Sequence, residues 1–489
     1  MMFEKNSRIN GIYISAAKRN SGKTTVSIAL SRLLRNKGLS VQPFKKGPDF
    51  IDPMWLNIAS GSRTYNLDFY FMSKNKIREH FITHSLNSEI SIVEGNHGLH
   101  DSFDIYGKSS NAEMAKLLGL PVILLIDVSE LNRGVVPLIL GFQEFDKGVN
   151  IKGIILNKVH SKRHEKNLLK AVKYYTDLKV VGSIPNNLEF SVKQRHLGLL
   201  STLSPEEVEK LVGGMSSKIS EYADLESIIK ISKIANKSYP NIKTNIKNSR
   251  VLGVQRKPNA RHPLKIGLAY DNAFNFYYNE NLEALENLGC EIIKFSPMGD
   301  QCLPEVDALY IGGGFPEIFS ADLQANIGIR KEIKQKIEGG LPVYAECGGL
   351  MYLCKSISYE NSFNEMVGII DADVRLTKKP KGHGYTKLTP YFYERSREGL
   401  WFNKIKLMKG HEFHHSFLEM SLDSLNRYKF IFKMKKGYGV DGTSDGIAYK
   451  NVLAGYTHMY SPSSPSWFKN WVAFIKQVKQ QVKAKAVLQ

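Results

Sequence analysis

The sequence predicts an α/β protein with two domains, each built around a mainly parallel sheet. Short apolar strands alternate with amphipathic helices through most of the 489 residues, which is the pattern of doubly wound strand–helix–strand units. The chain is too long for one ordinary hydrophobic core. A polar segment rich in Lys, Asn and Pro, at residues 235–263, interrupts the alternation. We therefore predict a first domain at 1–234, a linker at 235–263 and a second domain at 264–489.

Composition and charge limit the classes of function. Apolar residues make up 42% of the chain and charged residues 23%, as in ordinary globular enzymes. Lys and Arg outnumber Asp and Glu by 67 to 47, but they are spread along the chain. Such a balance can indicate nucleic acid, a membrane surface or an anionic small molecule, but a generally solvated surface explains much of it, and we expect neither nucleic acid nor a membrane as partner. No apolar run has the length of a membrane span, and four cysteines without a CxxC pair favour a reducing cytoplasm.

The first strand, at residues 8–14, runs into a phosphate-binding loop. The sequence SAAKRNSGKTT at 15–25 follows this strand and precedes a helical pattern at 26–39. In this arrangement backbone N–H groups wrap the phosphates, Lys23 neutralises the transferring group and Thr24 can hold Mg²⁺. We therefore predict that ATP is bound by the loop residues, which are Ser21, Gly22, Lys23, Thr24 and Thr25.

The loop departs from the usual pattern, because Ala16 and Ala17 stand where a glycine is expected. Lys18 resembles the additional lysine in the deviant loops of dimerising ParA and MinD type NTPases. This resemblance implies that Lys18 contacts nucleotide and that the chain can form a homodimer. A solvated loop lysine is the equally weighted alternative.

Two further strands end in charged or polar segments. The strand at 41–44 precedes KKGPDFIDP (45–53), and an apolar strand starting at residue 90 ends at Glu94-Gly95. Because carboxyl ends of parallel strands form the ligand crevice of such sheets, these segments can bring Mg²⁺-ATP and an acidic substrate together. A turn capped by its own Asp side chains explains 45–53 equally well. We predict metal ligands at Thr24, Asp49 and Glu94, and substrate contacts at Lys45, Asp52, Asn96 and His97.

The remaining segments continue the alternation. In the first domain we predict strands at 121–128, 151–159 and 179–187, a helix at 112–120, and a helical region at 204–234 that begins with the capping pattern SPEEVEKL. The second domain opens with a strand at 264–271, a helix within 274–290 and a strand at 291–297.

The segment LPVYAECGGLMYL at 341–353 has the pattern of a nucleophile elbow. A short apolar strand turns sharply into a helix, so that the corner side chain, Cys347, is exposed at the sheet edge beside the helix N-terminus. Backbone N–H groups and the helix dipole favour a thiolate there. A buried packing cysteine is the alternative, which residue type alone favours.

A run of three glycines, at residues 312–314, follows another predicted strand. Glycines let the backbone approach a ligand closely and direct N–H groups at it. Together with the amide after the nucleophile they can form an oxyanion hole, which we assign to Gly313, Gly314 and Gly348. A tightly packed turn is the alternative for this run.

Three later segments, HGYTKL, KGHEFHHSF and NVLAGYTHMY, are predicted to be strands that carry histidines. Their spacing matches no metal-binding motif, so we expect no metal there. One of these histidines can serve as the base for Cys347. The five are His383, His411, His414, His415 and His458.

In this order, the motifs SGKTT, KKGPDFIDP, EGNHGLHD, GGGFPE, AECGGLMYL, GHEFHHS and AGYTHMY resemble the glutamine-dependent cobyrinic acid a,c-diamide synthase family over essentially the whole chain. The resemblance implies an N-terminal P-loop NTPase-like amidoligase domain, similar to dethiobiotin synthetase, and a C-terminal class I glutamine amidotransferase domain. It also implies that Cys347 attacks glutamine and that His458 is its base. Relatives of this type lack the usual triad glutamate, so no third member is assigned.

The implied reaction uses ATP, Mg²⁺ and L-glutamine to amidate the a and c carboxylates of an anionic tetrapyrrole. Cys347 releases ammonia from glutamine, and an acyl phosphate formed at the Lys23 loop captures it. Water destroys such an intermediate, so a sheltered route for ammonia is expected.

Departures from the family pattern leave the macrocycle open. Asn96 and His97 follow Glu-Gly where a hydrophobic residue is usual, and Gln194 replaces a Glu in KQRHLGL. Relatives that amidate sirohaem or nickel-sirohydrochlorin remain alternatives, as does cobyric acid synthase, although GPDFIDP favours the a,c-diamide branch. A MinD/ParA-like regulatory ATPase is an alternative of another class, which the intact Cys347, triple glycine and His458 disfavour.

Overall fold

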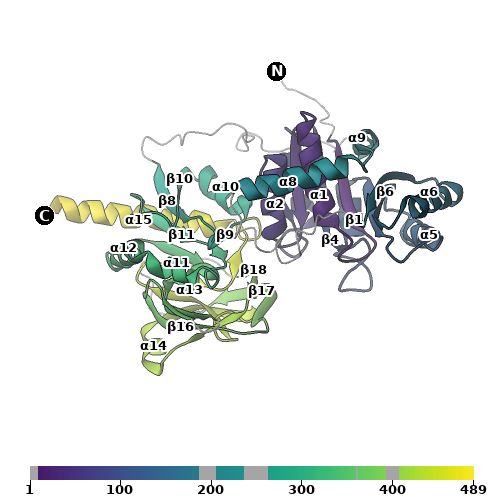
Figure 1. Cartoon of the computed structure of the whole chain (residues 1–489). Coiled ribbons are helices and arrows are strands. Elements are labelled where there is room, and N and C mark those ends of the chain that lie inside the picture. The colour runs from purple at the N-terminus through teal and green to yellow at the C-terminus, as the bar shows by residue number, and fades with distance from the viewer. Residues whose placement is uncertain (1–8, 187–204, 236–262, 360–361, 392–406, 489) are drawn as a thin grey trace, which may run out of the picture. The chain divides into compact units, whose positions relative to one another are not determined.

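The computed structural model describes residues 9–186, 205–235, 263–359, 362–391 and 407–488. The chain divides into two compact units, Met1–Gln255 and Arg256–Gln489 (Figure 1). This division falls within the predicted linker, nearly all of which lies outside the described residues, as do Gln194 and Ser204. Among the described helices, none is long and apolar enough to cross a membrane.

The first unit has the predicted doubly wound architecture. Its seven strands are parallel and follow the order β3-β2-β4-β1-β5-β6-β7. The strands are β1 (Gly11–Ala16), β2 (Val41–Lys46), β3 (Tyr65–Leu67), β4 (Ile90–Gly98), β5 (Val122–Asp127), β6 (Ile151–Val159) and β7 (Lys179–Pro185). The helices are α1 (Lys23–Asn36), α2 (Ile51–Ser60), α3 (Lys74–Ser85), α4 (Asn111–Leu118), α5 (Val135–Phe145), α6 (Lys162–Tyr175), α8 (Pro205–Ser220) and α9 (Leu225–Ser232).

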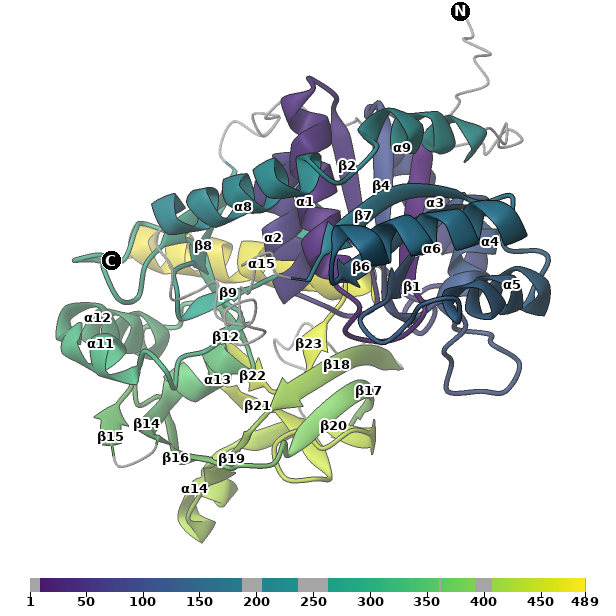
Figure 2. The same ribbon diagram turned by 45° about the vertical axis from the view of Figure 1, so that its right-hand side comes forward.

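Burial on both faces of this sheet explains why its strands are almost continuously apolar. Ile12 and Tyr13 of β1 point to opposite faces, and both are fully buried. On one face, α1 packs against α2 and α8, and all three share a hydrophobic core with the sheet (Figures 1 and 2). This packing fixes α1, and with it the loop that precedes α1, at the carboxyl end of β1.

Strand β4 is longer than the sequence indicates. The prediction ends this strand at Glu94-Gly95, but β4 continues to Gly98 because β1 pairs with it again, Ala16 opposite Gly98, after a shift of register. Glu94 is therefore a buried residue within the strand rather than a loop residue beyond it.

The second unit contains a ten-stranded mixed sheet in the order β10-β8-β11-β13-β22-β21-β20-β17-β18-β23. Neighbours from β10 to β22 are parallel, and those from β22 to β23 are antiparallel. Its strands are β8 (Leu264–Ala269), β10 (Cys290–Phe295), β11 (Ala308–Ile311), β13 (Val343–Glu346), β17 (Gly382–Pro390), β18 (Met408–His414), β20 (Lys429–Lys436), β21 (Ser444–Tyr449), β22 (Val452–Gly455) and β23 (His458–Met459).

Two smaller sheets complete the second unit. One has the order β15-β14-β16-β19, and the other pairs β12 with β9. Their strands are β9 (Phe274–Phe276), β12 (Gly313–Gly314), β14 (Cys354–Tyr359), β15 (Ser362–Glu365), β16 (Ile370–Leu376) and β19 (Ser416–Glu419). The helices of the unit are α10 (Asn279–Asn287), α11 (Ser320–Ala325), α12 (Ile327–Glu338), α13 (Gly348–Leu353), α14 (Leu422–Arg427) and α15 (Ser466–Leu488).

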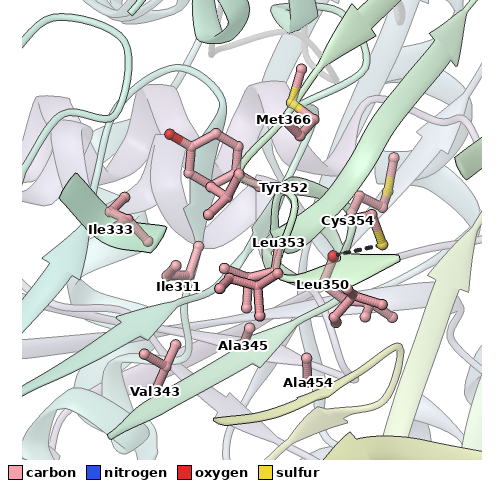
Figure 3. Packing of buried hydrophobic residues seen from close by; sticks show 14 of the residues in the cluster. Ile311, Ile333, Val343, Ala345, Leu350, Tyr352, Leu353, Cys354, Met366 and Ala454 are labelled. Atoms are coloured by element: carbon pink, nitrogen blue, oxygen red, sulfur yellow. Dashed lines mark hydrogen bonds between the residues drawn. The ribbon is translucent and has the colours of Figure 1, made fainter. Parts of the chain in front are cut away.

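Two hydrophobic cores lie on opposite faces of the ten-stranded sheet. Residues of α11, α12 and α13 fill one core, and residues of α10 and α15 fill the other. In the first core, Leu350 and Leu353 of α13 lie beside Val343 and Ala345 of β13 (Figure 3). The short helix α13 is thus held rigidly against the strand that leads into the predicted elbow.

Candidate active sites

The predicted elbow is present between β13 and α13. Cys347 has φ 50° and ψ −102°, a backbone conformation that non-glycine residues rarely adopt and that costs energy to maintain. Its amide donates a hydrogen bond to the carbonyl oxygen of Gly455, 2.7 Å away on β22. A Cβ added to Gly349 would lie 2.1 Å from the carbonyl oxygen of Ile311, which explains a glycine two residues after the cysteine. The strained corner is therefore held by strands on both sides.

The predicted base, His458, begins β23 and is buried. Its ring stacks on that of His411 with centroids 5.0 Å apart, and His411 Nδ1 lies 3.0 Å from the hydroxyl of Tyr278. A Cβ on Gly313 would fall 2.4 Å from His458 Cε1, so the glycine run borders the imidazole directly. Burial lowers the pKa of His458, which keeps the resting ring neutral and able to accept a proton.

The thiol of Cys347 is buried, and its Sγ lies 4.0 Å from the carbonyl oxygen of Phe413 on β18. Burial, with a further contribution from the Glu317 carboxylate, raises the pKa of this thiol. The predicted exposed thiolate at a helix N-terminus is thus not the resting state described here. Burial outweighs the contribution of a six-residue helix, and the proton must leave when substrate binds.

The glycine run does not form the simple loop that its sequence indicates. Gly313 and Gly314 form the short strand β12, antiparallel to β9. A Cβ on Gly348 would lie 3.1 Å from the amide nitrogen of Gly314 and 2.9 Å from Pro316. The three predicted oxyanion glycines therefore meet at the elbow, where their assignment stays a prediction.

The other predicted histidines have structural contacts. His414 stacks on Tyr456 with centroids 3.8 Å apart, and His383 packs against Phe413. His415 Nδ1 lies 3.3 Å from the carbonyl oxygen of Thr377. In the part of the chain that the structure describes, no group of three or more His, Cys, Asp or Glu side chains is arranged to hold a metal by itself.

In the first unit, the loop between β1 and α1 has the geometry of a phosphate-binding loop. Gly22 has φ 92°, a left-handed conformation suited to glycine, and α1 begins at Lys23. Asn157 at the end of β6 donates from Nδ2 to the carbonyl oxygen of Ser21 at 2.8 Å. Ser21 Oγ in turn donates to the carbonyl oxygen of Lys18, whose side chain is exposed. The sequence reasoning did not single out Asn157, because only the parallel order of the strands brings β6 to the loop.

Three carboxylates from two segments converge on Lys45 at the carboxyl end of β2. Its Nζ lies 2.7 Å from Glu94 Oε1 and 3.9 Å from Asp49, and it also pairs closely with Asp52. Burial alone would lower the pKa of Lys45, but the carboxylates of Asp52 and Glu94 outweigh burial and raise it. Lys45, predicted as a substrate contact, is thus the counter-ion of the acidic cluster in this state.

The two aspartates of 45–53 differ in their surroundings, and Asp49 makes the capping contacts of the alternative interpretation. Thr24 Oγ1 donates to Glu94 Oε1 at 2.8 Å and lies 3.3 Å from Asp52 Oδ2. Asp49 instead accepts from the backbone amides of Ile51 and Asp52 and so caps the start of α2. The structure therefore brings Asp52, rather than Asp49, to the predicted metal ligands Thr24 and Glu94.

Lys23 and Lys46 are both buried at the same end of the sheet. Burial, with the charge of Lys45, lowers the pKa of Lys23 to about 8. Burial also lowers the pKa of Lys46 to about 8, and its Nζ donates to Asn96 Oδ1 at 3.1 Å. Asn96 thus lies at the cluster, and the adjacent His97 is half-buried with a pKa lowered by burial and by Arg19.

Comparisons with known proteins identify a domain in each half of the chain. Residues 12–199 match the CobQ/CobB/MinD/ParA nucleotide-binding domain, and residues 265–465 match the CobB/CobQ-like glutamine amidotransferase domain. A nucleotide-binding domain followed by this second domain defines a glutamine-dependent amide-forming ligase.

Whole-length relatives give the particular family. Proteins named cobyrinate a,c-diamide synthase are 37% identical in Magnetococcus marinus, 39% in Picrophilus torridus and 36% in Archaeoglobus fulgidus. Each alignment covers 94% of this chain and 96–97% of the relative. The chain belongs to the cobyrinate a,c-diamide synthase family.

Proposed function

We propose that the protein amidates the a and c side-chain carboxylates of cobyrinic acid with ammonia from L-glutamine, at the expense of ATP. The whole-length likeness to relatives named for this reaction carries the proposal, together with the strained Cys347 elbow next to the glycine run that borders His458. An intact elbow also argues against a purely regulatory ATPase of the MinD/ParA kind.

In the second unit, Cys347 gives its proton to His458 and attacks the side-chain amide carbon of glutamine. The C–N bond breaks, the protonated imidazole supplies the proton for ammonia, and water hydrolyses the thioester to glutamate. The amides of Gly314 and Gly348 are the proposed donors to the oxyanion. The buried, neutral state of His458 suits the first of these proton transfers.

In the first unit, the β1–α1 loop and Lys23 bind the phosphates of ATP so that a substrate carboxylate takes the γ-phosphoryl group. Mg²⁺ fits the residues present, because Glu94 Oε2 is buried without a hydrogen-bond partner in the described structure. Thr24 Oγ1 lies 2.8 Å from Glu94 Oε1 and 3.3 Å from Asp52 Oδ2, so three oxygen-bearing side chains lie together. We propose Thr24, Asp52 and Glu94 as its protein ligands. When bound, the ion supplies positive charge for the phosphate oxygens.

Binding of an anionic tetrapyrrole accords with the net charge of +20 and with the lysines at the nucleotide end of the sheet. We assign Lys46, Asn96 and His97 to its contacts. We also propose a reducing, cytoplasmic location, since all four cysteines are free.

The proposal is tested with Cys347→Ala and with Cys302→Ala, an exposed cysteine, as the matched control. Glutamine-dependent amidation should fall at least about 10³-fold in Cys347→Ala only, because the nucleophile is lost. Amidation with ammonium should remain near the wild-type rate in both variants. Loss of the ammonium-dependent reaction in Cys347→Ala would contradict the division of labour between the units.

The macrocycle is tested by supplying cobyrinic acid, sirohaem and nickel-sirohydrochlorin separately, and by counting the amides formed by mass spectrometry. We expect two amides on cobyrinic acid. If sirohaem or nickel-sirohydrochlorin is amidated with a higher kcat/KM than cobyrinic acid, that macrocycle is the substrate. The proposed amidation reaction would then still hold.

A further inference from the structure

The glutaminase site contains a buried carboxylate that faces the base. Glu346 is the last residue of β13, directly before the nucleophile, and it is almost fully buried. Its Oε2 lies 4.0 Å from Nδ1 of His458. A buried carboxylate is costly unless its oxygens accept hydrogen bonds, so the partners of Glu346 show what holds it in place.

Three donors hold the Glu346 carboxylate. Its Oε1 accepts from the backbone amide of Met459 at 2.8 Å and from the hydroxyl of Tyr344. Its Oε2 accepts from the hydroxyl of Tyr310 at 2.8 Å. Both tyrosines are buried in the core beneath α15, so they cannot follow a moving carboxylate. Glu346 is therefore fixed in a single position relative to the sheet.

The bond to Met459 ties the base to the nucleophile strand. β23 consists of His458 and Met459, and in the ten-stranded sheet it pairs with β18, many strands away from β13 in the order. The Glu346 side chain joins β13 to β23 directly, through the amide next to His458. Glu346 thus precedes the nucleophile in the chain, and its side chain holds the backbone next to the base His458.

Another buried carboxylate near the Cys347 thiol, that of Glu412, has a structural role that differs from the role of Glu346. Glu412 on β18 accepts from the backbone amides of Tyr438 at 2.6 Å and of Gly439 at 2.8 Å, one on each oxygen. These bonds hold the turn between β20 and β21. Its nearest histidine is His414, at 3.6 Å, which is not the proposed base. Glu412 therefore provides a matched control for Glu346.

We propose that Glu346 is the positioning residue for His458, so that the missing third member of the catalytic group comes from the residue before the nucleophile. The carboxylate favours a proton on Nδ1, the nitrogen that faces it, and leaves the other ring nitrogen to accept the proton of Cys347. After that transfer, the carboxylate stabilises the imidazolium until the departing ammonia takes the proton. This inference rests on the proposed glutaminase role of Cys347 and His458.

The environment of Glu346 gives the proposal a pH signature. Burial raises the pKa of Glu346 to about 7, although Tyr344, Met459 and Tyr310 donate to it. Three ionisable groups lie next to the Glu346 carboxylate: Tyr310 of β11, Tyr344 of β13 and His458 of β23. Cys347 and Tyr277 interact with its charge. The tyrosines keep their protons over the working range because burial raises their pKa values. The fraction of Glu346 that is ionised, and so able to orient His458, therefore increases as pH rises through 7.

The experiment measures glutaminase kcat and KM from about pH 6 to about pH 9, a range that includes the Glu346 pKa of about 7. The proteins are the full-length wild type, Glu346→Gln, Glu346→Asp and Glu412→Gln. Wild-type kcat should rise through pH 7. In Glu346→Gln, kcat should fall about 10²-fold or more, the rise near pH 7 should disappear, and KM should change little. Glu346→Asp should recover part of kcat together with the rise.

Ammonium-dependent amidation reports folding of the rest of the protein and should be unchanged in Glu346→Gln. The proposal is overturned if Glu346→Gln keeps kcat within about threefold of wild type, a change too small for the loss of a residue that orients the base. It is equally overturned if Glu412→Gln gives the same loss and pH profile, or if Glu346→Asp recovers neither kcat nor the rise. A wild type without glutaminase activity would instead refute the proposed function.

Discussion

At the scale of single residues, both sites combine a local sequence motif with contacts between distant segments of the chain. The Cys347 corner and the Lys23 loop each lie within one continuous motif. Glu346 and Asn157 act through contacts with segments more than a hundred residues away, Met459 and Ser21. Asp49 and Asp52 could not be told apart in sequence, since their roles depend on where α2 starts.

The depressed pKa of Lys23 gives a prediction at this scale. Burial disfavours the ammonium form, whereas the phosphates of ATP favour it, so ATP binding takes up a proton once pH exceeds about 8. Affinity for ATP should then fall by up to about tenfold per pH unit above 8. Equilibrium binding titrations across this range measure the slope.

Lys23→Arg is the control, because a guanidinium keeps its charge throughout the range. The affinity of Lys23→Arg for ATP should show a much smaller pH dependence than that of the wild type. Equal slopes for wild type and Lys23→Arg would show that Lys23 is not the group that takes up the proton.

At the scale of elements, the alternation of apolar strands and amphipathic helices predicted the parallel sheets, because burial on both faces leaves a clear apolar pattern. The apolar pattern did not predict strands that form only because a neighbouring strand pairs with them. Two glycines of β12 have no strand propensity, and they pair with β9 because the elbow packs against them. The last residues of β4 are polar and stay in the sheet through renewed pairing with β1.

The packing of α13 against β11 leads to a prediction about the elbow. In Gly349→Ala the new Cβ would meet the carbonyl oxygen of Ile311 at 2.1 Å, and a backbone atom cannot yield as a side chain can. We expect the second unit to lose about 1–3 kcal/mol of stability. Glutaminase activity should fall more than ammonium-dependent amidation, because the strained Cys347 corner must shift.

Gly328→Ala is the comparison, since its Cβ would have only ordinary contacts, the nearest at 3.5 Å. Thermal unfolding followed by calorimetry, with both activities assayed on the same samples, separates the two variants. Similar unfolding curves for Gly349→Ala and the wild type would mean that the elbow tolerates a side chain there.

At the scale of the whole molecule, the sequence supported two units and their nucleotide and glutamine chemistry because each motif came with its expected strand and helix. Charge gives the prediction at this scale. A chain with net charge +20 should attract a polycarboxylate at long range. Raising ionic strength from about 0.1 M to about 1 M shortens the Debye length from about 10 Å to about 3 Å, and the KM for the tetrapyrrole should rise several-fold.

Glutamine serves as an internal reference in that experiment, because it carries no net charge at neutral pH. Its KM in the glutaminase assay should change little over the same range of salt. A tetrapyrrole KM that is independent of salt would show that short-range contacts alone bind the substrate.

The burial of Cys347 has a consequence for the lifetime of the enzyme. Peroxides oxidise the thiolate form of cysteine far faster than the thiol, and they need access to the sulfur. In the resting protein this sulfur is covered and burial raises its pKa, whereas Cys302 is exposed. Oxidants should therefore react with Cys302 first. The thiolate of Cys347 forms only during turnover, when glutamine is bound and reacts with it.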